Sequence, residues 1–279
     1  MSVINIETRK ANELAATSNI SDSSILMVHD GTGLKRITFE DVKRAMVYPN
    51  AGSHNSIYRG KYLGNSVSTA QYSAIRNGTF EDLFIGDYWT IGDIDYRIAA
   101  FDYYFNTGDT PCKVHHIVIV PDQCLYNSNM NDSGTTTGGY VGSKLYRNGL
   151  NNAKLTIENA FSNHILSIRL YLSNSMVNGK VSSRAWFDSK VNLLSEVMVY
   201  SSVSFLPMGD GMNNILNHKV EKSQLPLFAL NHNCISNNNS WWLRDVTSSS
   251  EFANIYYMGN SNSTIANLQL GIRPYFCIS

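Results

Sequence analysis

The sequence predicts an α+β fold, because strand-like segments at both ends of its larger part enclose helical patterns in the middle. Its 279 residues are enough for one sizeable domain and a smaller attachment. Pro49 and the polar run 50–55 separate the two. We therefore expect a small docking or oligomerisation segment over 1–48, a linker with a short helix over 49–79, and a binding domain over 80–279.

The first segment has the pattern of a β-hairpin followed by a helix. Two short apolar runs, 24–28 and 34–37, flank the glycine-rich turn 30–33, which is typical of paired strands. Thr38 is placed to cap a helix that should run to about Met46. A unit this small buries too little area to be robust alone. We expect it to gain stability by oligomerising or by docking on another protein.

The larger domain begins with a helix and three strands. The helix is expected over 68–77, with a serine cap, and Gly78 is placed to end it in a left-handed conformation. Segments 88–91 and 94–101 flank a Gly-Asp turn and predict a hairpin. The apolar run 115–120 predicts a buried strand.

The rest of the domain changes from helical to alternating periodicity. Helices are predicted over 139–149, 153–161 and 188–199, with a strand over 165–172 between them. Later alternation predicts strands over 227–230, 240–244, 252–258 and 268–278. The Asn/Ser/Gly tracts 236–240 and 259–267 are predicted as loops at one end of the sheet. We expect strands from the two ends of the domain to pair.

Composition excludes several partners. Charged residues make up 16% of the chain, against about 25% in ordinary soluble domains. The 22 Lys and Arg balance the 22 Asp and Glu, with no basic block, so nucleic acid is not an expected partner. No apolar run has the length of a membrane span and the N-terminus lacks the apolar core of a signal peptide, so we expect no membrane insertion and synthesis in a cytosol.

Cysteines, histidines and carboxylates give no complete catalytic or metal site. The four cysteines are expected as buried free thiols, although their even number also permits two disulfides. Adjacent His115 and His116 on a strand point to opposite faces, and no metal-binding motif completes them. Asp93 and Asp95 are interpreted as a solvated hairpin rim. No nucleophile-elbow or phosphate-loop motif occurs, so we expect no enzyme, no metal and no cofactor.

Aromatic and amide side chains are the remaining candidates for a site. The chain has 16 Tyr and 4 Trp, and asparagines crowd its last third. Tyr and Trp give large contact area at small entropy cost, and Asn adds adaptable hydrogen bonds. The predicted ligand-binding residues are Asn237, Asn238, Asn239, Trp241, Tyr256, Asn260, Asn262 and Asn267. At least one of Trp241 and Trp242 is expected to pack in the core instead, and the loop asparagines also fit an interpretation as solvated connectors.

The strings WWLRD, over 241–245, and GIRPYF, over 271–276, carry a family resemblance. They resemble the closing motifs of C-type-lectin-like domains in phage and bacterial surface proteins. Further blocks look like structural proteins of phages that infect gut Firmicutes: 85–90, 96–102, 115–122, 136–142 and 188–200. The resemblance implies mixed antiparallel sheets with inserted helices, and we expect the two closing strings to lie side by side in one sheet.

The resemblance also implies a function. Segment 14–46 is similar to the leader of phage tail and fibre proteins, which implies attachment to other virion proteins through 1–48. The final loops, 236–240 and 251–267, would then bind a host-surface polysaccharide or protein. We expect a homo-oligomer, such as a trimer, located in the virion after assembly in the host cytoplasm. The alternatives are a purely structural head or tail decoration or fibre protein that binds its virion neighbours, and a depolymerase or oxidase.

Departures from the family's pattern limit what is carried over. The EPN and WND motifs of calcium-dependent sugar binding are absent, so calcium-dependent glycan binding is not implied. Formylglycine-generating enzymes need two closely placed cysteines, and Cys234 and Cys277 lack the matching sequence context. Arg244 and Arg273 are expected to act as structural anchors, because a planar guanidinium can hold several carbonyls or a carboxylate at once.

Overall fold

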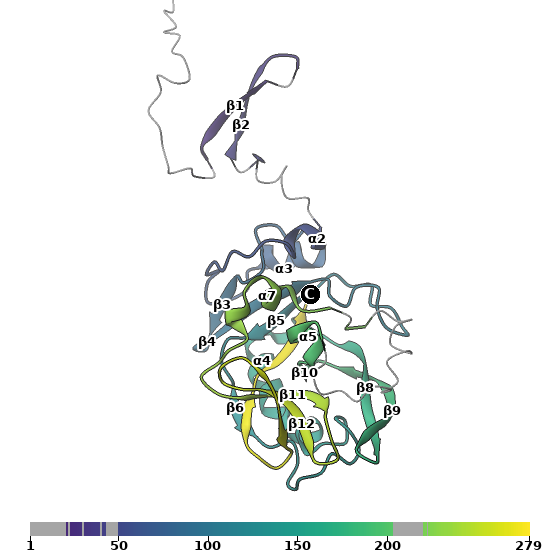
Figure 1. The fold of residues 1–279 in the computed structure, drawn as a ribbon. Coiled ribbons are helices and arrows are strands. Elements are labelled where there is room, and N and C mark those ends of the chain that lie inside the picture. Colours follow the sequence, from purple (N-terminus) through teal and green to yellow (C-terminus); the bar gives the residue numbers. More distant parts are fainter. Residues whose placement is uncertain are drawn as a thin grey trace, which may run out of the picture. The chain divides into compact units, whose positions relative to one another are not determined.

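The structure is a computed structural model that describes residues 21, 23–29, 31–39, 41–42, 50–202, 220–221 and 223–279. The chain divides into two compact units, Met1–Tyr48 and Pro49–Ser279 (Figure 1). The architecture is mixed α+β, with mostly antiparallel sheets and few helices, which confirms the α+β part of the prediction.

The smaller unit contains the predicted hairpin. Strands β1 (Ile25–His29) and β2 (Leu34–Thr38) pair antiparallel. The backbone N–H of Asp41 donates to Thr38 Oγ1 at 3.1 Å, which confirms the threonine as a helix cap. Most of the predicted helix and the leader before residue 21 lie outside the described residues.

The larger unit is built around a six-stranded antiparallel sheet. Its strands are β3 (Tyr88–Ile91), β4 (Ile94–Phe101), β5 (Ile117–Pro121), β7 (Ile165–Leu166), β10 (Val191–Leu193) and β15 (Pro274–Ile278). The order is β10-β15-β5-β4-β3, and β7 also pairs with β15. Phe276 in the last strand lies opposite Ile119 in β5, so strands from both ends of the domain share one sheet, as predicted (Figure 1).

A five-stranded sheet forms from the last third of the chain and one earlier strand. Its strands are β6 (Tyr126–Ser128), β11 (Trp241–Val246), β12 (Glu251–Ile255), β13 (Ser261–Ile265) and β14 (Leu270–Ile272), in the order β13-β12-β11-β14-β6. Trp241 pairs with Gly271 in parallel. The two closing strings therefore pair only where Trp241 meets Gly271, because the chain leaves this sheet at Arg273 and continues as β15 in the central sheet.

A two-stranded sheet and several short helices complete the larger unit. The sheet pairs β8 (Ile168–Val177) with β9 (Lys180–Ser189). The α-helices are α2 (Ala51–His54), α3 (Thr69–Arg76), α4 (Asn151–Phe161), α5 (Glu196–Tyr200) and α7 (Pro226–Leu230). Short helical turns are η2 (Leu145–Gly149), η3 (Ser162–His164) and η4 (His232–Cys234).

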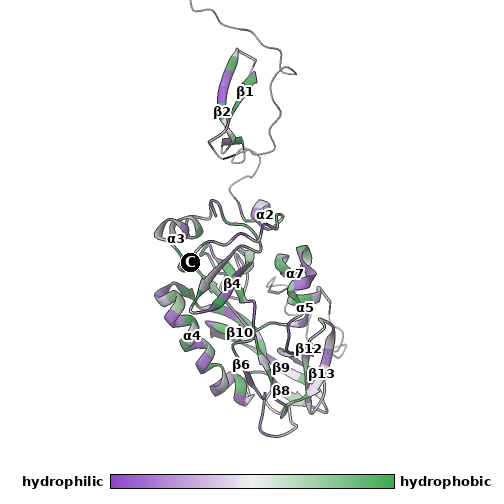
Figure 2. Cartoon of the chain, turned by 90° about the vertical axis from the view of Figure 1, so that its left-hand side faces the viewer, coloured by the Kyte–Doolittle hydropathy of each residue, from purple (hydrophilic) through white to green (hydrophobic). Residues whose placement is uncertain are grey.

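Two predicted helices form as expected. Ser68 caps α3, with its hydroxyl accepting from Gln71 N and the Gln71 side chain accepting from Ser68 N. Gly78 follows the helix at a φ of +70°. Helix α4 buries Ala153 and every fourth residue after it, and Figure 2 shows hydrophobic and hydrophilic patches alternating along this helix.

Other predicted elements were wrong. The helix expected over 188–199 is the end of β9, then β10, and only then α5. All three residues of β10 are buried. The strand therefore lacks the alternation of buried and exposed residues by which a strand is recognised in a sequence. The strand expected over 227–230 is helix α7, because Pro226 occupies the first helical turn and presets its φ. The helix expected over 139–149 is limited to the π-helical turn η2, and strand β9 was not predicted.

Tryptophans and cysteines differ in how deeply they are buried. Trp89, Trp241 and Trp242 are fully buried. All four cysteines are free thiols, as expected, but only Cys277 is fully buried and the other three are half-buried. No described helix is long and apolar enough to cross a membrane.

Candidate functional site

Two loops meet at one end of the five-stranded sheet. Segment 236–240 leads into β11, and segment 256–260 joins β12 to β13. Trp241 pairs with Ile255, and Ile255 pairs with Ser261, so the register brings both loops to the same edge. The backbone N–H of Asn237 donates to Tyr257 O at 3.3 Å. We call residues 236–240 and 256–260 together the tip.

The tip exposes aromatic, apolar and amide side chains. Tyr257 is 47% exposed and Met258 is 67% exposed. Tyr256 is also exposed, and its ring centroid lies 4.4 Å from that of Tyr257. Neither loop contains a charged residue. The tip therefore offers contact area and hydrogen bonds but no charge of its own.

Hydrogen bonds to helix α5 fix the conformation of the tip. Tyr200 Oη donates to Gly259 O at 2.7 Å, and Ser261 Oγ donates to Glu196 Oε1 at 2.7 Å. Gly259 has a φ of +95°, and a Cβ there would lie 3.4 Å from Ser236 Cβ. Burial, together with the nearby Glu196 carboxylate, raises the pKa of Tyr200 well above 10. Its hydroxyl therefore stays protonated as a donor at neutral pH.

The structure brings together most of the predicted ligand-binding residues. Asn238, Asn239, Tyr256 and Asn260 are exposed on the tip, and Asn237 is half-buried there. The Asn237 side chain donates to Asp122 O at 2.9 Å, so it ties the tip to the end of β5.

Three predicted site residues lie elsewhere. Trp241 is fully buried and donates through Nε1 to Ile235 O at 3.3 Å, so it supports the tip from beneath and has no surface to offer a ligand. Asn262 is half-buried within β13, because the segment expected as a loop is a strand. Asn267 follows the far end of β13, where Ile265 pairs with Glu251, and it is therefore remote from the tip.

Two exposed tip residues were missing from the predicted set. Tyr257 and Met258 continue the alternation of β12 in the sequence, which predicts a strand with one side chain inward. The signal against that interpretation was Gly259, whose left-handed conformation starts the reversal of the chain. A hairpin turn over 256–260 would have predicted their exposure.

The arginines of the closing strings are structural anchors, as expected. Arg273 is fully buried, and it donates to Pro121 O and to Cys234 O, each at 2.8 Å. Its guanidinium carbon also lies 5.1 Å from the ring centroid of Trp241. One side chain thus fixes the segment before the tip to the end of the central sheet.

Arg244 anchors a buried polar cluster. It forms an ion pair with Glu221 and reaches Tyr275 Oη at 3.4 Å. Tyr104 Oη lies 2.7 Å from Tyr275 Oη and 3.0 Å from Glu221 Oε1. Burial raises the pKa of Tyr275 to about 12. The cluster is a closed set of satisfied partners, which is suited to holding β11 against β15.

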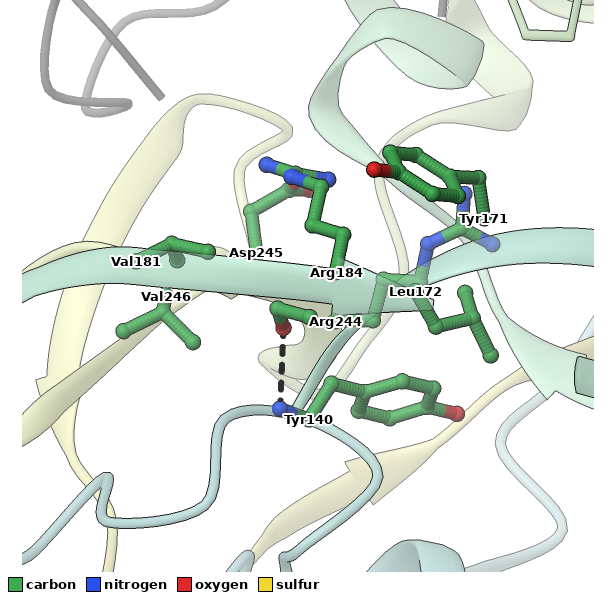
Figure 3. A pocket seen from close by; sticks show the side chains of 9 residues that line it. Tyr140, Tyr171, Leu172, Val181, Arg184, Arg244, Asp245 and Val246 are labelled. Atoms are coloured by element: carbon green, nitrogen blue, oxygen red, sulfur yellow. Dashed lines mark hydrogen bonds between the residues drawn. The ribbon is translucent and has the colours of Figure 1, made fainter. Parts of the chain in front are cut away.

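A small pocket beside this cluster does not fit a ligand (Figure 3). Its lining residues are Tyr140, Tyr171, Leu172, Ser173, Val181, Arg184, Arg244, Asp245 and Val246. Its water-accessible volume is about 10 Å³, roughly enough for one water molecule. Asp245 and Arg184 point toward one another there (Figure 3), and burial raises the pKa of the Asp245 carboxyl above its ordinary value.

His115, His116 and Asp95 are engaged in structural bonds, and Asp93 is exposed in the hairpin turn. His116 is fully buried, and its Nε2 accepts a backbone N–H at 3.1 Å. His115 Nδ1 lies 2.7 Å from a carboxylate oxygen of Asp102. Asp95 accepts from Thr90 Oγ1 at 2.6 Å, and Asp93 lies in the turn with a φ of +64°. Within the described part of the chain, no group of three or more His, Cys, Asp or Glu could hold a metal ion.

Comparison with known proteins gives one family. The family model described as "Domain of unknown function (DUF6273)" matches residues 115–279. This segment includes the tip and β15 but begins after β3 and β4, which pair with the matched strands in the central sheet. No curated protein and no solved structure matches the chain.

Proposed function

Since the chain belongs to the DUF6273 family of domains of unknown function, we propose a function from its own geometry. It is a binding protein of a tailed-bacteriophage particle, without enzymatic activity, and its tip contacts a polysaccharide or protein on the host-cell surface. The uncharged, exposed surface of the tip is the observation that carries this proposal.

The composition of the tip supports ligand binding. Tyr256, Tyr257 and Met258 present apolar area beside the exposed amides of Asn238 and Asn260. This mixture of rigid aromatics and adaptable polar groups is typical of binding loops. The tip also rests on a sheet and on fixed hydrogen bonds, so little order has to be gained on binding.

A C-type-lectin-like fold for the larger unit is part of the proposal. The sequence resemblance in WWLRD and GIRPYF supports it. So does the arrangement of the C-terminal strand, which lies in the central sheet beside an early strand, while a smaller sheet carries the terminal loops. In that family the final strands and their loops form the ligand face, which here corresponds to the tip.

The smaller unit would attach the chain to the particle. Its two-stranded hairpin exposes Met27 and Leu34, and an isolated hairpin is marginally stable in water. Docking on other virion proteins, or association with further copies, would cover these side chains. Many copies on one particle would also raise the effective concentration for each further contact with the host.

Adsorption to host cells tests the proposal. The full chain is added to Firmicutes cells, and bound protein is measured against a variant with Asn238→Ala, Asn260→Ala and Tyr257→Ala. We expect binding by the wild type and at least a tenfold loss in the variant. The matched control is Asn152→Ala, an exposed asparagine on α4, which should bind like the wild type.

Two results would contradict the proposal. One is unchanged adsorption of the tip variant. The other is a cryo-EM map of the particle in which the tip is enclosed by other virion proteins, because that position would favour the purely structural alternative. Cleavage of host envelope polymer by the purified chain would revive the enzymatic alternative.

A further inference from the structure

A second group of exposed tyrosines lies near the start of the larger unit. Tyr62 is 53% exposed and Tyr58 is 38% exposed. Each forms an isolated parallel β-bridge within the larger unit, Tyr62 to Tyr88 at the start of β3 and Tyr58 to Ile85. The ring centroids of Tyr62 and Tyr88 lie 5.6 Å apart. We call Tyr58, Tyr62 and Tyr88 the tyrosine ridge.

Direct contacts connect the ridge to the tip. The guanidinium carbon of Arg97 lies 4.6 Å from the ring centroid of Tyr88, and Arg97 Nε donates to Asp122 Oδ1 at 2.7 Å. The backbone oxygen of Asp122 accepts from the Asn237 side chain at 2.9 Å. Asn237 in turn bonds to Tyr257. Every link is a contact between neighbours, so a short series of direct contacts joins the ridge to the tip.

A second connection runs through Tyr58. Burial raises the pKa of the Cys234 thiol, two residues before the tip, and the nearby Tyr58 side chain is among the groups that oppose this shift. The Tyr58 ring lies flat against Gly86, and any Cβ at that glycine would collide with it. The ridge is therefore held in place, like the tip.

The charged side chains of the ridge and its surroundings balance one another in ion pairs. Arg59 pairs with Asp82 and Asp87, Lys61 pairs with Asp82, and Arg97 pairs with Asp122. The exposed rings form two platforms, one on the ridge and one on the tip, and the tip adds the exposed amides of Asn238 and Asn260. This pattern differs from a protein-binding surface, where an apolar centre is contiguous and surrounded by a polar rim.

We propose that the ridge and the tip together bind one neutral polysaccharide chain, several sugar units long. The C–H face of a sugar ring packs on the electron-rich face of an aromatic ring, and sugar hydroxyls bond to the exposed amides of the tip. This inference rests on the proposed function and deepens it, because it names the ligand class and adds residues 58–88, which precede the family match at residue 115.

The experiment uses the full chain and polysaccharide purified from the envelope of the cells to which it adsorbs. The polysaccharide is partly hydrolysed and separated into short and long fragments, and each is used as a competitor for adsorption. We expect the long fragments to compete at least tenfold better than disaccharides, because only they reach both platforms.

Variants identify the platform involved. Tyr62→Ala should weaken binding of long fragments by roughly three- to tenfold, the range of one aromatic contact. It should leave binding of short fragments to the tip unchanged. Tyr62→Phe keeps the ring and should bind like the wild type. Leu155→Ala, which removes an exposed side chain from α4, is the surface control.

The outcomes separate this inference from the proposed function. Both proposals are overturned if the wild type does not adsorb, or if the tip variant adsorbs as well as the wild type. Loss with the tip variant but none with Tyr62→Ala overturns the extended surface alone. Equal competition by short and long fragments does the same. Adsorption that is abolished by protease treatment of the cells, with no competition by any fragment, means a protein partner and overturns the ligand class.

Discussion

At the residue scale, buried charges in this chain act as structural supports. Arg244 lies among Glu221, Tyr275 and Tyr104 in the interior, and its ion pair is almost fully shielded from solvent. Removing one partner of such a pair leaves the other as an uncompensated buried charge, which is more costly than the loss of the attraction itself.

This cost gives a first prediction. Arg244→Ala should lower the free energy of unfolding by about 3–5 kcal/mol, measured by urea denaturation. Lys190→Ala removes a half-exposed pair with Glu158 at 3.6 Å and should cost about 0–1 kcal/mol. Arg244→Met combined with Glu221→Leu should recover part of the loss, because no charge is left unpaired. Equal effects of the two single alanine variants would contradict the shielded pair.

His116 gives a prediction for pH. Burial lowers its pKa below the ordinary 6.5, with a smaller effect from His115 and opposing effects from the Val114 carbonyl and from Asp102. Above pH 6.5 the imidazole is neutral in both states. Below it, the unfolded chain takes up a proton that the folded chain does not, so stability falls as the pH decreases. Burial also lowers the pKa of His54, so this residue adds to the loss of stability as the pH decreases.

The check is the free energy of unfolding between about pH 7 and pH 5, the range in which histidines titrate. The wild type should lose stability across this range. His116→Gln, whose amide keeps a donor and an acceptor but does not titrate, should lose less. His232→Gln changes an exposed histidine and should follow the wild type. If His116→Gln lost as much stability as the wild type across this range, His116 would not be the source of the pH dependence.

Trp241 shows why the sequence located the tip but not all of its residues. Alternation in a strand predicts one inward and one outward side chain. Here Trp241 and Trp242 are both buried, because both faces of β11 are covered. The neighbours that cover the second face come from distant segments, such as Ser128, which accepts from Trp242 Nε1 at 2.9 Å. Local pattern contains no information about them.

At the element scale, prediction succeeded where signals were local. The cap of α3 and the Gly-Asp turn between β3 and β4 are encoded within a few residues, and both form. Prediction failed for β10, whose strand conformation depends on pairing with β15 some 80 residues later. It failed for β13 because SNSTI has the composition of a loop and becomes a strand by pairing with β12.

The cap of α3 is open to a direct test. Ser68→Ala should lower the free energy of unfolding by about 1 kcal/mol, since it leaves Gln71 N without a partner. Ser73→Ala, an exposed position inside the same helix, should be neutral or slightly stabilising because alanine favours helix. Thermal or urea unfolding of both variants measures the difference. A larger loss for Ser73→Ala than for Ser68→Ala would show that the cap is unimportant.

At the scale of the whole molecule, the larger unit depends on contacts between its ends. Strand β15 lies between β5 and both β10 and β7, so the central sheet is incomplete until the last residues are in place. The family match begins at residue 115, yet β3 and β4 occupy one side of this sheet. We infer that 49–114 is needed for the matched segment to fold.

The smaller unit gives the final prediction. The β1–β2 register places Ile25, Met27 and Leu34 on one face of the hairpin, and all three are more than half exposed. A two-stranded ribbon with uncovered apolar side chains is marginal in water, so association of copies would bury those side chains. We expect light scattering to give the full chain a mass at least twice that of one copy, which is 31.2 kDa.

Replacing the apolar side chains should separate the copies without harming the larger unit. Ile25→Asp with Met27→Asp should give a monomer, because charges would otherwise be buried at the interface. Its thermal unfolding should match that of the wild type's larger unit, since the two units are separate in the chain. The double variant should also adsorb to cells more weakly, although its tip is intact, because single contacts no longer reinforce one another. A wild-type chain that is already monomeric would refute self-association and leave docking on another virion protein as the way to cover this face.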